Sequence, residues 1–363
     1  MPGSHKKKSA LSVSEGVETP GSINPQAVNQ LKRTKKRPYS NAQLFQGIRE
    51  GNTSMLGQAI TLVESSLESH QEAAQELVAE CLPLAGGAFR VGITGVPGAG
   101  KSTFIEALGK HIIDRGGKLA VLAIDPSSER SRGSILGDKT RMEELSASSM
   151  AYIRPSPSGG SLGGVARKTR ETIILCEAAG FDTIFVETVG VGQSETAVHS
   201  MVDFFLLLML PGAGDELQGI KRGIMEMADA IVINKADGTN IQKARRARAE
   251  FANALHLFPP STSGWVPRVQ TCSSLYKEGI SEVWDVAGEF ADFVKENGYL
   301  NKHRMEQARY WMYETLREGI YDLVFNDPAM KKELESYEKA ISEGRITSFM
   351  AATSILNKYK SGN

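Results

Sequence analysis

The sequence predicts an α/β protein in which a mostly parallel, doubly wound sheet is preceded by helices and followed by a helical arm. Between residues 89 and 271, short runs rich in β-branched and aromatic residues alternate with longer helical patterns. These runs are continuously apolar rather than alternating, which is typical of parallel strands that are covered on both faces. From 41 to 88 and again after 280, apolar residues recur only at helical spacing.

Composition excludes several classes of protein. The chain has 363 residues, 41% of them hydrophobic, with 42 Lys and Arg against 42 Asp and Glu. These values exclude a wholly disordered chain, and the lack of a glycine period excludes a collagen-like one. The longest apolar run, Phe204 to Leu210, is far shorter than the ~20 residues that span a bilayer, so we expect a soluble protein without a membrane partner. Cys81, Cys176 and Cys272 are too widely spaced to indicate a disulfide framework or a zinc site, so a reducing, cytoplasmic compartment is expected.

The first forty residues differ in charge from the rest. They carry eight Lys and Arg against two Glu and contain no apolar stretch. We expect a disordered basic tail that is either solvated or lies on an acidic partner. Because no aromatic residues are interleaved with the basic ones, a nucleic-acid partner is not expected.

The order of elements follows from the periodicity. Two or three helices are expected over 41–88, since apolar residues recur at spacings of three and four. The expected strands are Phe89 to Thr94, Leu119 to Ile124, Met150 to Ile153, Thr183 to Glu187, Phe204 to Leu210, Ile231 to Asn234 and Val266 to Thr271. After Tyr276 a helical stripe comprises Met305, Ala308, Met312, Leu316, Ile320 and Leu323, and further helices follow from Ala329 and from Ser348. The stripe either pairs with a second subunit or folds back on the sheet. We therefore divide the chain into a tail (1–40), a helical region (41–88), a nucleotide-binding domain (89–280) and a C-terminal helical region (281–363).

A phosphate-binding loop follows the first expected strand. The loop comprises Gly95, Val96, Pro97, Gly98, Ala99, Gly100, Lys101, Ser102 and Thr103, and a helical pattern begins directly after it. This is G-x-x-x-x-G-K-S in the strand, loop and helix context that the motif requires. Its backbone N–H groups can surround phosphates, Lys101 can reach the β and γ phosphates, and the Ser102 hydroxyl can ligate Mg²⁺.

The sixth expected strand ends in a base-recognition motif, Asn234-Lys235-Ala236-Asp237. Asp237 can accept hydrogen bonds from N1–H and the 2-amino group of guanine, while the Lys235 stem lies on the ring. Adenine has an acceptor at N1, which would leave the carboxylate unpaired, and such mismatches discriminate by ~10⁴ or more. The seventh strand supplies the loop expected to meet the guanine O6, which comprises Ser273, Ser274 and Leu275. A plain serine-rich turn is the alternative for that loop.

The metal and γ-phosphate elements lie between these motifs. Asp125 and Glu187 follow the second and fourth strands, where carboxylates can hold Mg²⁺ directly or through water. Because most GTPases have Asp at the position of Glu187, water-mediated contact is favoured. Asp138 is a rival ligand, and both aspartates could instead cap a helix or turn. The Gly190 N–H could detect the γ phosphate, and Gln193 could orient the attacking water or bind backbone or a partner.

The order and the sequences of these motifs closely resemble those of the MeaB/MMAA (ArgK-like) family of P-loop GTPases. The resemblance rests on the P-loop, Asp125-Pro126-Ser127-Ser128, Gly137-Asp138-Lys139-Thr140-Arg141-Met142, Glu187 through Glu195 and Asn234-Lys235-Ala236-Asp237. It covers the chain from Ser40 onward. It implies a GTPase domain with N-terminal helices and a C-terminal dimerisation arm that binds GTP or GDP with Mg²⁺. It also implies slow hydrolysis coupled to loading, protecting and reactivating an adenosylcobalamin-dependent acyl-CoA mutase such as methylmalonyl-CoA mutase.

Other functions fit the sequence less well. A nickel-insertion GTPase should carry a His-rich tract or close Cys/His ligands, and a signal-recognition GTPase should carry a Met-rich RNA-binding module. A P-loop kinase for a small metabolite would not need N-K-x-D. The chain also lacks the D-x-H-x-x-G phrase of cobalamin-binding domains, so the cofactor is expected to belong to the partner. The glycine-rich loop 211–222 is expected to be a third switch that exchanges charge partners when the γ phosphate leaves. An ordinary long connection with solvated charges is the alternative for this loop.

Overall fold

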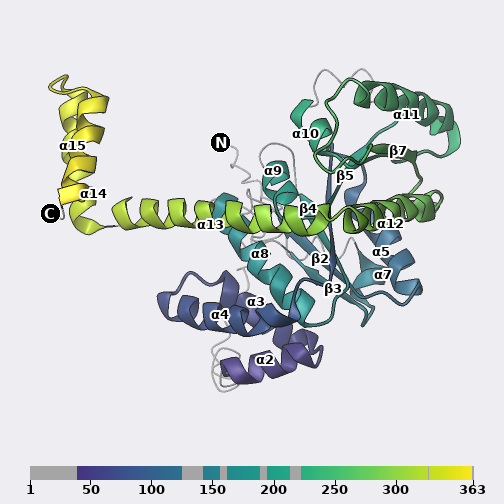
Figure 1. Ribbon diagram of the computed structural model, residues 1–363, viewed down its shortest axis with the longest axis horizontal. Coiled ribbons are helices and arrows are strands. Elements are labelled where there is room, and N and C mark those ends of the chain that lie inside the picture. The colour runs from purple at the N-terminus through teal and green to yellow at the C-terminus, as the bar shows by residue number, and fades with distance from the viewer. Residues whose placement is uncertain are drawn as a thin grey trace, which may run out of the picture. The chain divides into compact units, whose positions relative to one another are not determined.

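The structure is a computed structural model of the chain and describes residues 39–124, 142–155, 162–188, 194–212, 222–325 and 327–361. Residues Asn41–Asn363 form a compact unit. This unit, shown with its elements labelled in Figure 1, contains all of the features described below.

A seven-stranded sheet forms the centre of this unit. Its strands are β1 (Phe89–Gly95), β2 (Leu119–Ile124), β3 (Ala151–Arg154), β4 (Thr183–Thr188), β5 (Phe204–Met209), β6 (Ala230–Ile233) and β7 (Arg268–Thr271). Their order is β3-β2-β4-β1-β5-β6-β7, and every pairing is parallel. The expected doubly wound parallel sheet is therefore confirmed. The chain adds strands on one side of β1 and then on the other, so the strand order reverses beside β1. Ligands bind at this position in sheets of this kind.

The strand boundaries follow the expected ones closely, with one informative difference. β2 has the expected bounds, whereas β7 begins at Arg268 rather than Val266. Pro267 has no N–H to donate to a sheet ladder, so the chain joins β6 only after it. Val266 is consequently exposed instead of buried in the sheet.

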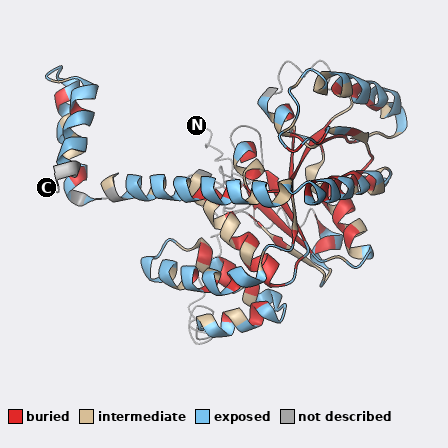
Figure 2. Cartoon of the chain, viewed as in Figure 1, coloured by how far each residue is buried: buried red, intermediate tan, exposed pale blue. Residues whose placement is uncertain are grey.

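Helices cover both faces of the sheet, as the buried residues in Figure 2 indicate. On one face, α5 (Lys101–Asp114), α7 (Glu143–Ser146) and α12 (Ile280–Glu296) share a core cluster with alternate residues of β1, β2 and β5. On the other face, α10 (Arg222–Met227) and α11 (Ile241–Leu255) pack on β5, β6 and β7. The helices α8 (Leu162–Ala178) and α9 (Ser194–His199) contact β2 and β4, respectively. Continuous apolar strands are thus explained by apolar neighbours on both sides.

Three helices precede the sheet: α2 (Asn41–Arg49), α3 (Thr53–Glu64) and α4 (Glu68–Cys81), followed by the 3-10 helix Leu82–Leu84. The Asn52 side chain accepts hydrogen bonds from the N–H groups of Ser54 and Met55 and so caps α3. The three helices pack on one another and against α8. Lys168 of α8 donates to the Glu64 carbonyl at 2.6 Å, which satisfies an acceptor at the end of α3.

The C-terminal helices are α12, α13 (Tyr299–Phe325), α14 (Pro328–Ser342) and α15 (Ser348–Ser361). Although α12 follows the expected domain boundary at 280, seven of its residues are buried and most of them belong to the sheet's core cluster. The expected stripe on α13 is different, since Met305 is 70% exposed and Leu316 is 57% exposed. Figure 2 shows the same contrast between the two helices.

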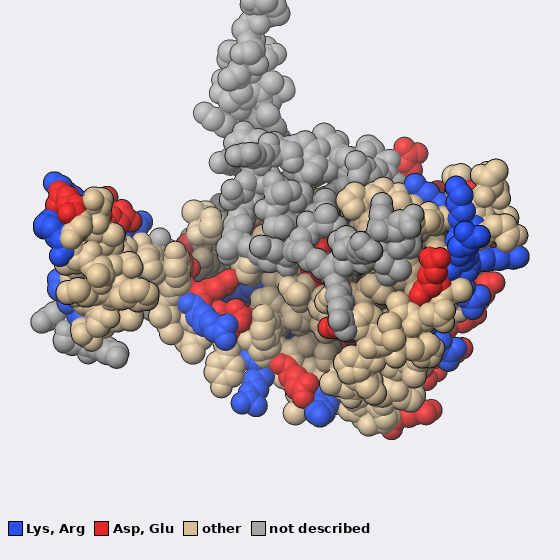
Figure 3. All heavy atoms as spheres, turned by 90° about the horizontal axis from the view of Figure 1, so that it is seen from above, with Lys and Arg blue, Asp and Glu red and all other residues tan. Residues whose placement is uncertain are grey.

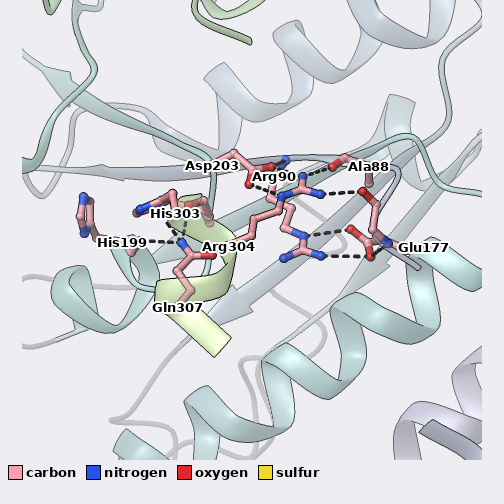
Figure 4. Close-up of polar contacts among 10 residues, drawn as sticks. Ala88, Arg90, Glu177, His199, Asp203, His303, Arg304 and Gln307 are labelled. Carbon is pink, nitrogen blue, oxygen red and sulfur yellow. Dashed lines mark hydrogen bonds and ion pairs between the residues drawn. The ribbon is translucent and has the colours of Figure 1, made fainter. Parts of the chain in front are cut away.

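The first turns of α13 are fixed to the sheet by a polar network (Figure 4). Arg304 donates from Nε to Asp203 Oδ1 at 2.7 Å and from Nη2 to Asp203 Oδ2 at 2.6 Å. The same guanidinium donates to the carbonyls of Gly86 and Ala88. Next to it, Arg90 forms a two-bonded ion pair with Glu177 of α8. Because each buried charge has an opposite partner and additional hydrogen bonds, the beginning of α13 is held in one position.

Two surface properties complete the description. None of the helices within the described ranges is both long and apolar enough to cross a membrane. On the face presented in Figure 3, the visible Lys and Arg side chains lie among Asp and Glu side chains.

Candidate functional site: a guanine nucleotide site at the carboxyl end of the sheet

The phosphate-binding loop connects β1 to α5 at the carboxyl end of the central strand. Gly98 and Gly100 both have positive φ, at 77° and 87°, a conformation that glycine adopts without strain. A Cβ atom at Gly100 would lie 2.9 Å from Asn234 Nδ2, and one at Gly95 would lie 2.3 Å from the Leu208 carbonyl oxygen. These glycines therefore allow both the turn and its close approach to β5 and to the chain after β6.

Lys101, the first residue of α5, lies beside this loop. Its Nζ donates to the Gly95 carbonyl at 2.8 Å, which fixes the ammonium over the loop and leaves further N–H donors for phosphate oxygens. Burial lowers the pKa of Lys101, whereas the nearby carboxylates of Glu187 and Glu195 oppose that shift. Ser102 and Thr103 follow in the first turn of α5, where helix N–H groups and the helix dipole favour an anion.

Asn234 joins the three nucleotide-binding segments. Its Nδ2 donates to the Ala99 carbonyl of the phosphate loop at 2.8 Å. Its Oδ1 accepts from the Ser274 N–H at 3.1 Å and from the Ser274 hydroxyl at 2.8 Å. The side chain is buried, at 2% exposure, so these bonds are not replaced by water. One amide thus sets the position of the base-recognition motif relative to both loops.

Asp237 and Ser273 lie together at the edge of the base site. The Ser273 hydroxyl donates to Asp237 Oδ2 at 2.6 Å, which orients the carboxylate and leaves acceptor sites on both oxygens for a ligand. Lys235 has a positive φ of 57°, which is uncommon for a residue with a side chain and is often found at functional sites. Leu275, next in the expected O6 loop, is 71% exposed beside these groups. The sequence-predicted residues of the base site are therefore brought together.

Glu187 and Thr188 end β4 beside the phosphate loop. Glu187 is 3% exposed, and the Thr188 hydroxyl lies 2.9 Å from the Thr94 hydroxyl of β1. Oxygen donors such as Glu187 and the Ser102 hydroxyl are the types that Mg²⁺ prefers. Asp125, Asp138, Gly190 and Gln193 lie outside the described residues, as does the 213–221 part of the expected third switch.

Three contributors to the site were not among the sequence-predicted residues. Glu195, on the first turn of α9, is buried and acts electrostatically on Lys101. The Cys272 thiol points at Asn234 Oδ1, with 3.5 Å between the sulfur and the oxygen. Gly279 has a positive φ, and a Cβ there would lie 2.5 Å from the Thr271 carbonyl oxygen. The sequence does show Glu195 as an acidic residue after a switch motif and Gly279 as a glycine before a helix. It does not show which distant residues these two contact in the folded chain.

Comparisons with known proteins agree with this geometry. Residues 56–329 match the family model described as methylmalonyl Co-A mutase-associated GTPase MeaB. A probable GTPase of Mycobacterium tuberculosis is 49% identical over 313 residues, covering 86% of this chain and 93% of that protein. The mouse (Mus musculus) protein named methylmalonic aciduria type A homolog, mitochondrial, is 46% identical over 329 residues, covering 88% of this chain and 79% of its own length.

A solved structure is similar across the same part of the chain. The crystal structure described as LAO/AO transport system kinase has a TM-score of 0.71 and 37% sequence identity, covering 88% of this chain and 97% of that one. The phosphate loop, the base motif and these relatives together identify a guanine nucleotide-binding enzyme that hydrolyses GTP. The chain belongs to the MeaB family of methylmalonyl Co-A mutase-associated GTPases.

Proposed function

We propose that this GTPase binds an adenosylcobalamin-dependent acyl-CoA mutase and couples GTP hydrolysis to loading, protecting and reactivating the mutase's cofactor. The family description and the name of the mouse relative support a mutase partner. Residues 89–280 act as the GTPase domain, and the helices on either side carry contacts to partners. Cobalamin belongs to the mutase in this proposal.

The nucleotide is held by residues with distinct tasks. The N–H groups of residues 95–103 and the Lys101 ammonium bind the phosphates, while Asn234, Lys235, Asp237 and the loop of Ser273, Ser274 and Leu275 hold guanine. Mg²⁺, when bound, neutralises charge on the β and γ phosphates. The Ser102 hydroxyl and Glu187 would hold it on this side, with Asp125 and Asp138 as further candidates. Gly190 would contact the γ phosphate and Gln193 would orient the water.

The observation that best supports the GTPase part of this proposal is the set of hydrogen bonds that the Asn234 side chain makes. They join the phosphate loop to the base motif, an arrangement that a kinase using ATP would not require. Nickel insertion is disfavoured because the sequence contains no His-rich tract and no closely spaced Cys and His ligands.

The experiment is a coupled assay with purified mutase. GTP hydrolysis is measured for this chain alone and with methylmalonyl-CoA mutase in its apo and cofactor-loaded forms, and complex formation is followed by size-exclusion chromatography. We expect slow hydrolysis alone and faster hydrolysis with the mutase. Unchanged hydrolysis and no complex with either form would contradict the mutase assignment while leaving GTPase activity intact.

We also propose that the exposed stripe of α13 pairs with a second copy of the chain. The support is a row of exposed apolar side chains on a helix whose first turns are fixed to the sheet. Ending the chain near Glu282 is unsuitable as a test because it removes α12 from the core. Light scattering on Leu316→Glu with Ile320→Glu should instead report a monomer, whereas Arg317→Glu, an exposed neighbour, should leave a dimer. A dimer in both variants would place the interface elsewhere.

A further inference from the structure

A cavity of about 310 Å³ lies at the amino-terminal ends of β5 and β6, at the opposite end of these strands from the nucleotide site. Its walls come from the end of α9, the turn before β6, the loop 258–267, α12 and the start of α13. This volume is at the lower end of the range of small-molecule sites. Figure 4 shows His199, Asp203 and His303, three of its lining residues, beside the network that fixes α13.

Acidic residues line the cavity, and among the described residues Lys and Arg do not. The acidic residues are Asp203, Glu226 and Asp229. Asp203 is neutralised by Arg304. His199 does not contribute positive charge near pH 7, because burial lowers its pKa to about 4. Burial also lowers the pKa of His303, so both imidazoles are neutral and can act as acceptors.

The carboxyl group of Asp229 lines this cavity without a Lys or Arg side chain beside it in the described lining. Its Oδ2 accepts the Phe205 N–H at 2.9 Å, and no ion pair to Lys, Arg or His is formed within the described chain. Burial raises the pKa of Asp229 to about 7, with the Phe205 N–H as the one opposing group. Holding a carboxylate in such a position costs free energy unless a cation binds beside it.

The remaining walls suit the carbon skeleton of an organic ion. Aromatic rings of Phe205, Phe258, Phe290 and Tyr299 line the cavity, together with three prolines. Aromatic faces attract ammonium groups, and apolar walls favour an alkyl chain. At ~30 Å³ for each water-sized group, the volume accommodates roughly ten non-hydrogen atoms. A bare metal ion would leave most of that space and all of the aromatic surface unused.

We propose that this cavity binds a small organic monocation, an alkylammonium or similar protonated amine, whose charge pairs with Asp229 and whose carbon chain lies against the aromatic walls. The Tyr299 hydroxyl, which lies 3.1 Å from the Thr262 hydroxyl, offers a further polar contact at the mouth of the cavity. This site is separate from the proposed GTP and mutase functions and does not depend on them.

The cavity is lined by residues of three segments that lead to the phosphate site, the base site and the C-terminal helices. His199 ends α9, which begins directly after the switch motif that follows Glu187. Asp229 precedes β6, which leads to Asn234, and Tyr299 begins α13. A ligand in the cavity therefore touches the elements that continue to the phosphates, the base and the C-terminal helices.

The test uses the full-length protein with butylammonium chloride as the probe. Saturation-transfer NMR should show contact with the butyl protons, and the probe should raise the melting temperature. Butan-1-ol, which has the same chain without the charge, should bind at least about tenfold more weakly. Potassium chloride at equal ionic strength should not compete. Equal binding of butan-1-ol, or full competition by potassium, would overturn the proposal.

Two variants locate the binding. Asp229→Asn keeps an acceptor for the Phe205 N–H while removing the charge, and should weaken butylammonium binding roughly 10- to 100-fold. Asp292→Asn makes the same change on the exposed face of α12 and should bind as the wild type does. Tyr299→Leu removes an aromatic wall and should also weaken binding, which keeps the test decisive if Asp229→Asn folds poorly. Unchanged affinity in a folded Asp229→Asn variant, or in Tyr299→Leu, would refute the assignment.

Discussion

Asn234 donates its side-chain amide to the carbonyl of Ala99 at 2.8 Å, across 135 residues of sequence. Replacing Asn234 by Asp places a carboxylate oxygen against that carbonyl and removes the donor. We expect affinity for GTP and GDP to fall together, roughly 10- to 100-fold, because the bond positions the phosphate loop and not the γ phosphate alone. Calorimetric titration with both nucleotides measures this. The exposed Asn253→Asp on α11 is the control, and a loss confined to GTP would contradict the interpretation.

Asp237 should determine the choice of base. The carboxylate, oriented by Ser273, is expected to accept from N1–H and the 2-amino group of guanine. Asp237→Asn should weaken GTP binding at least about 100-fold and improve binding of xanthosine triphosphate, whose 2-oxygen pairs with an amide donor. Competition between the two nucleotides measures the change. If the variant keeps the wild-type preference for GTP, another group reads the base.

Lys101 should be needed for hydrolysis. Lys101→Ala removes the ammonium held above the phosphate loop, and we expect kcat to fall at least about 100-fold with weaker triphosphate binding. Phosphate release under saturating GTP gives the rate. Lys110→Ala is a matched control, because Lys110 is on the same helix but lies at the surface in an ion pair with Asp114. Near-normal turnover of Lys101→Ala would disprove the assigned role.

Arg304 should contribute strongly to stability. Arg304→Ala leaves the Asp203 carboxylate buried without its cation, which should lower the free energy of unfolding by about 3–5 kcal/mol. Urea denaturation monitored by circular dichroism measures this value. In Arg317→Ala the lost ion pair, to Glu314, lies at the surface and should matter little. Equal effects of the two substitutions would mean that the network at the start of α13 is not a main source of stability.

The pH dependence of stability should reveal Asp229. Its pKa is raised to about 7 in the folded protein, so between about pH 4 and pH 7 the folded state holds a proton that the unfolded chain has released. The contribution of Asp229 to stability therefore decreases as pH rises through this range. Around it, His199 and His303 are neutral over the upper part of the range, and Asp203 is paired with Arg304. The unfolding free energy of the wild type should thus decrease relative to that of Asp229→Asn as the pH rises from 4 to 7. A difference that stays constant would show that Asp229 has an ordinary pKa.

The sequence alone predicted the parallel sheet, because strands that are buried on both faces must be apolar at every position. The glycines and Lys101 of the phosphate loop, and the Asn234 to Asp237 motif, could be read from spacing because each acts within one short segment. The boundary of β7 was misjudged by two residues, since the apolar run includes Val266 while Pro267 cannot donate to the ladder.

The tertiary structure decided which distant residues meet. Arg304 contacts Asp203 across 101 residues, and Asn234 contacts Ser274 across 40, although nothing in the local pattern pairs them. It also decided that α12 enters the core while the apolar stripe of α13 remains exposed. Nothing in the local sequence distinguishes Asp229 from the other aspartates, and only the folded chain places it in the lining of a cavity without a Lys or Arg beside it among the described residues. Local spacing determines which element a segment forms, but burial and charge balance depend on which surfaces that element meets after the chain has folded.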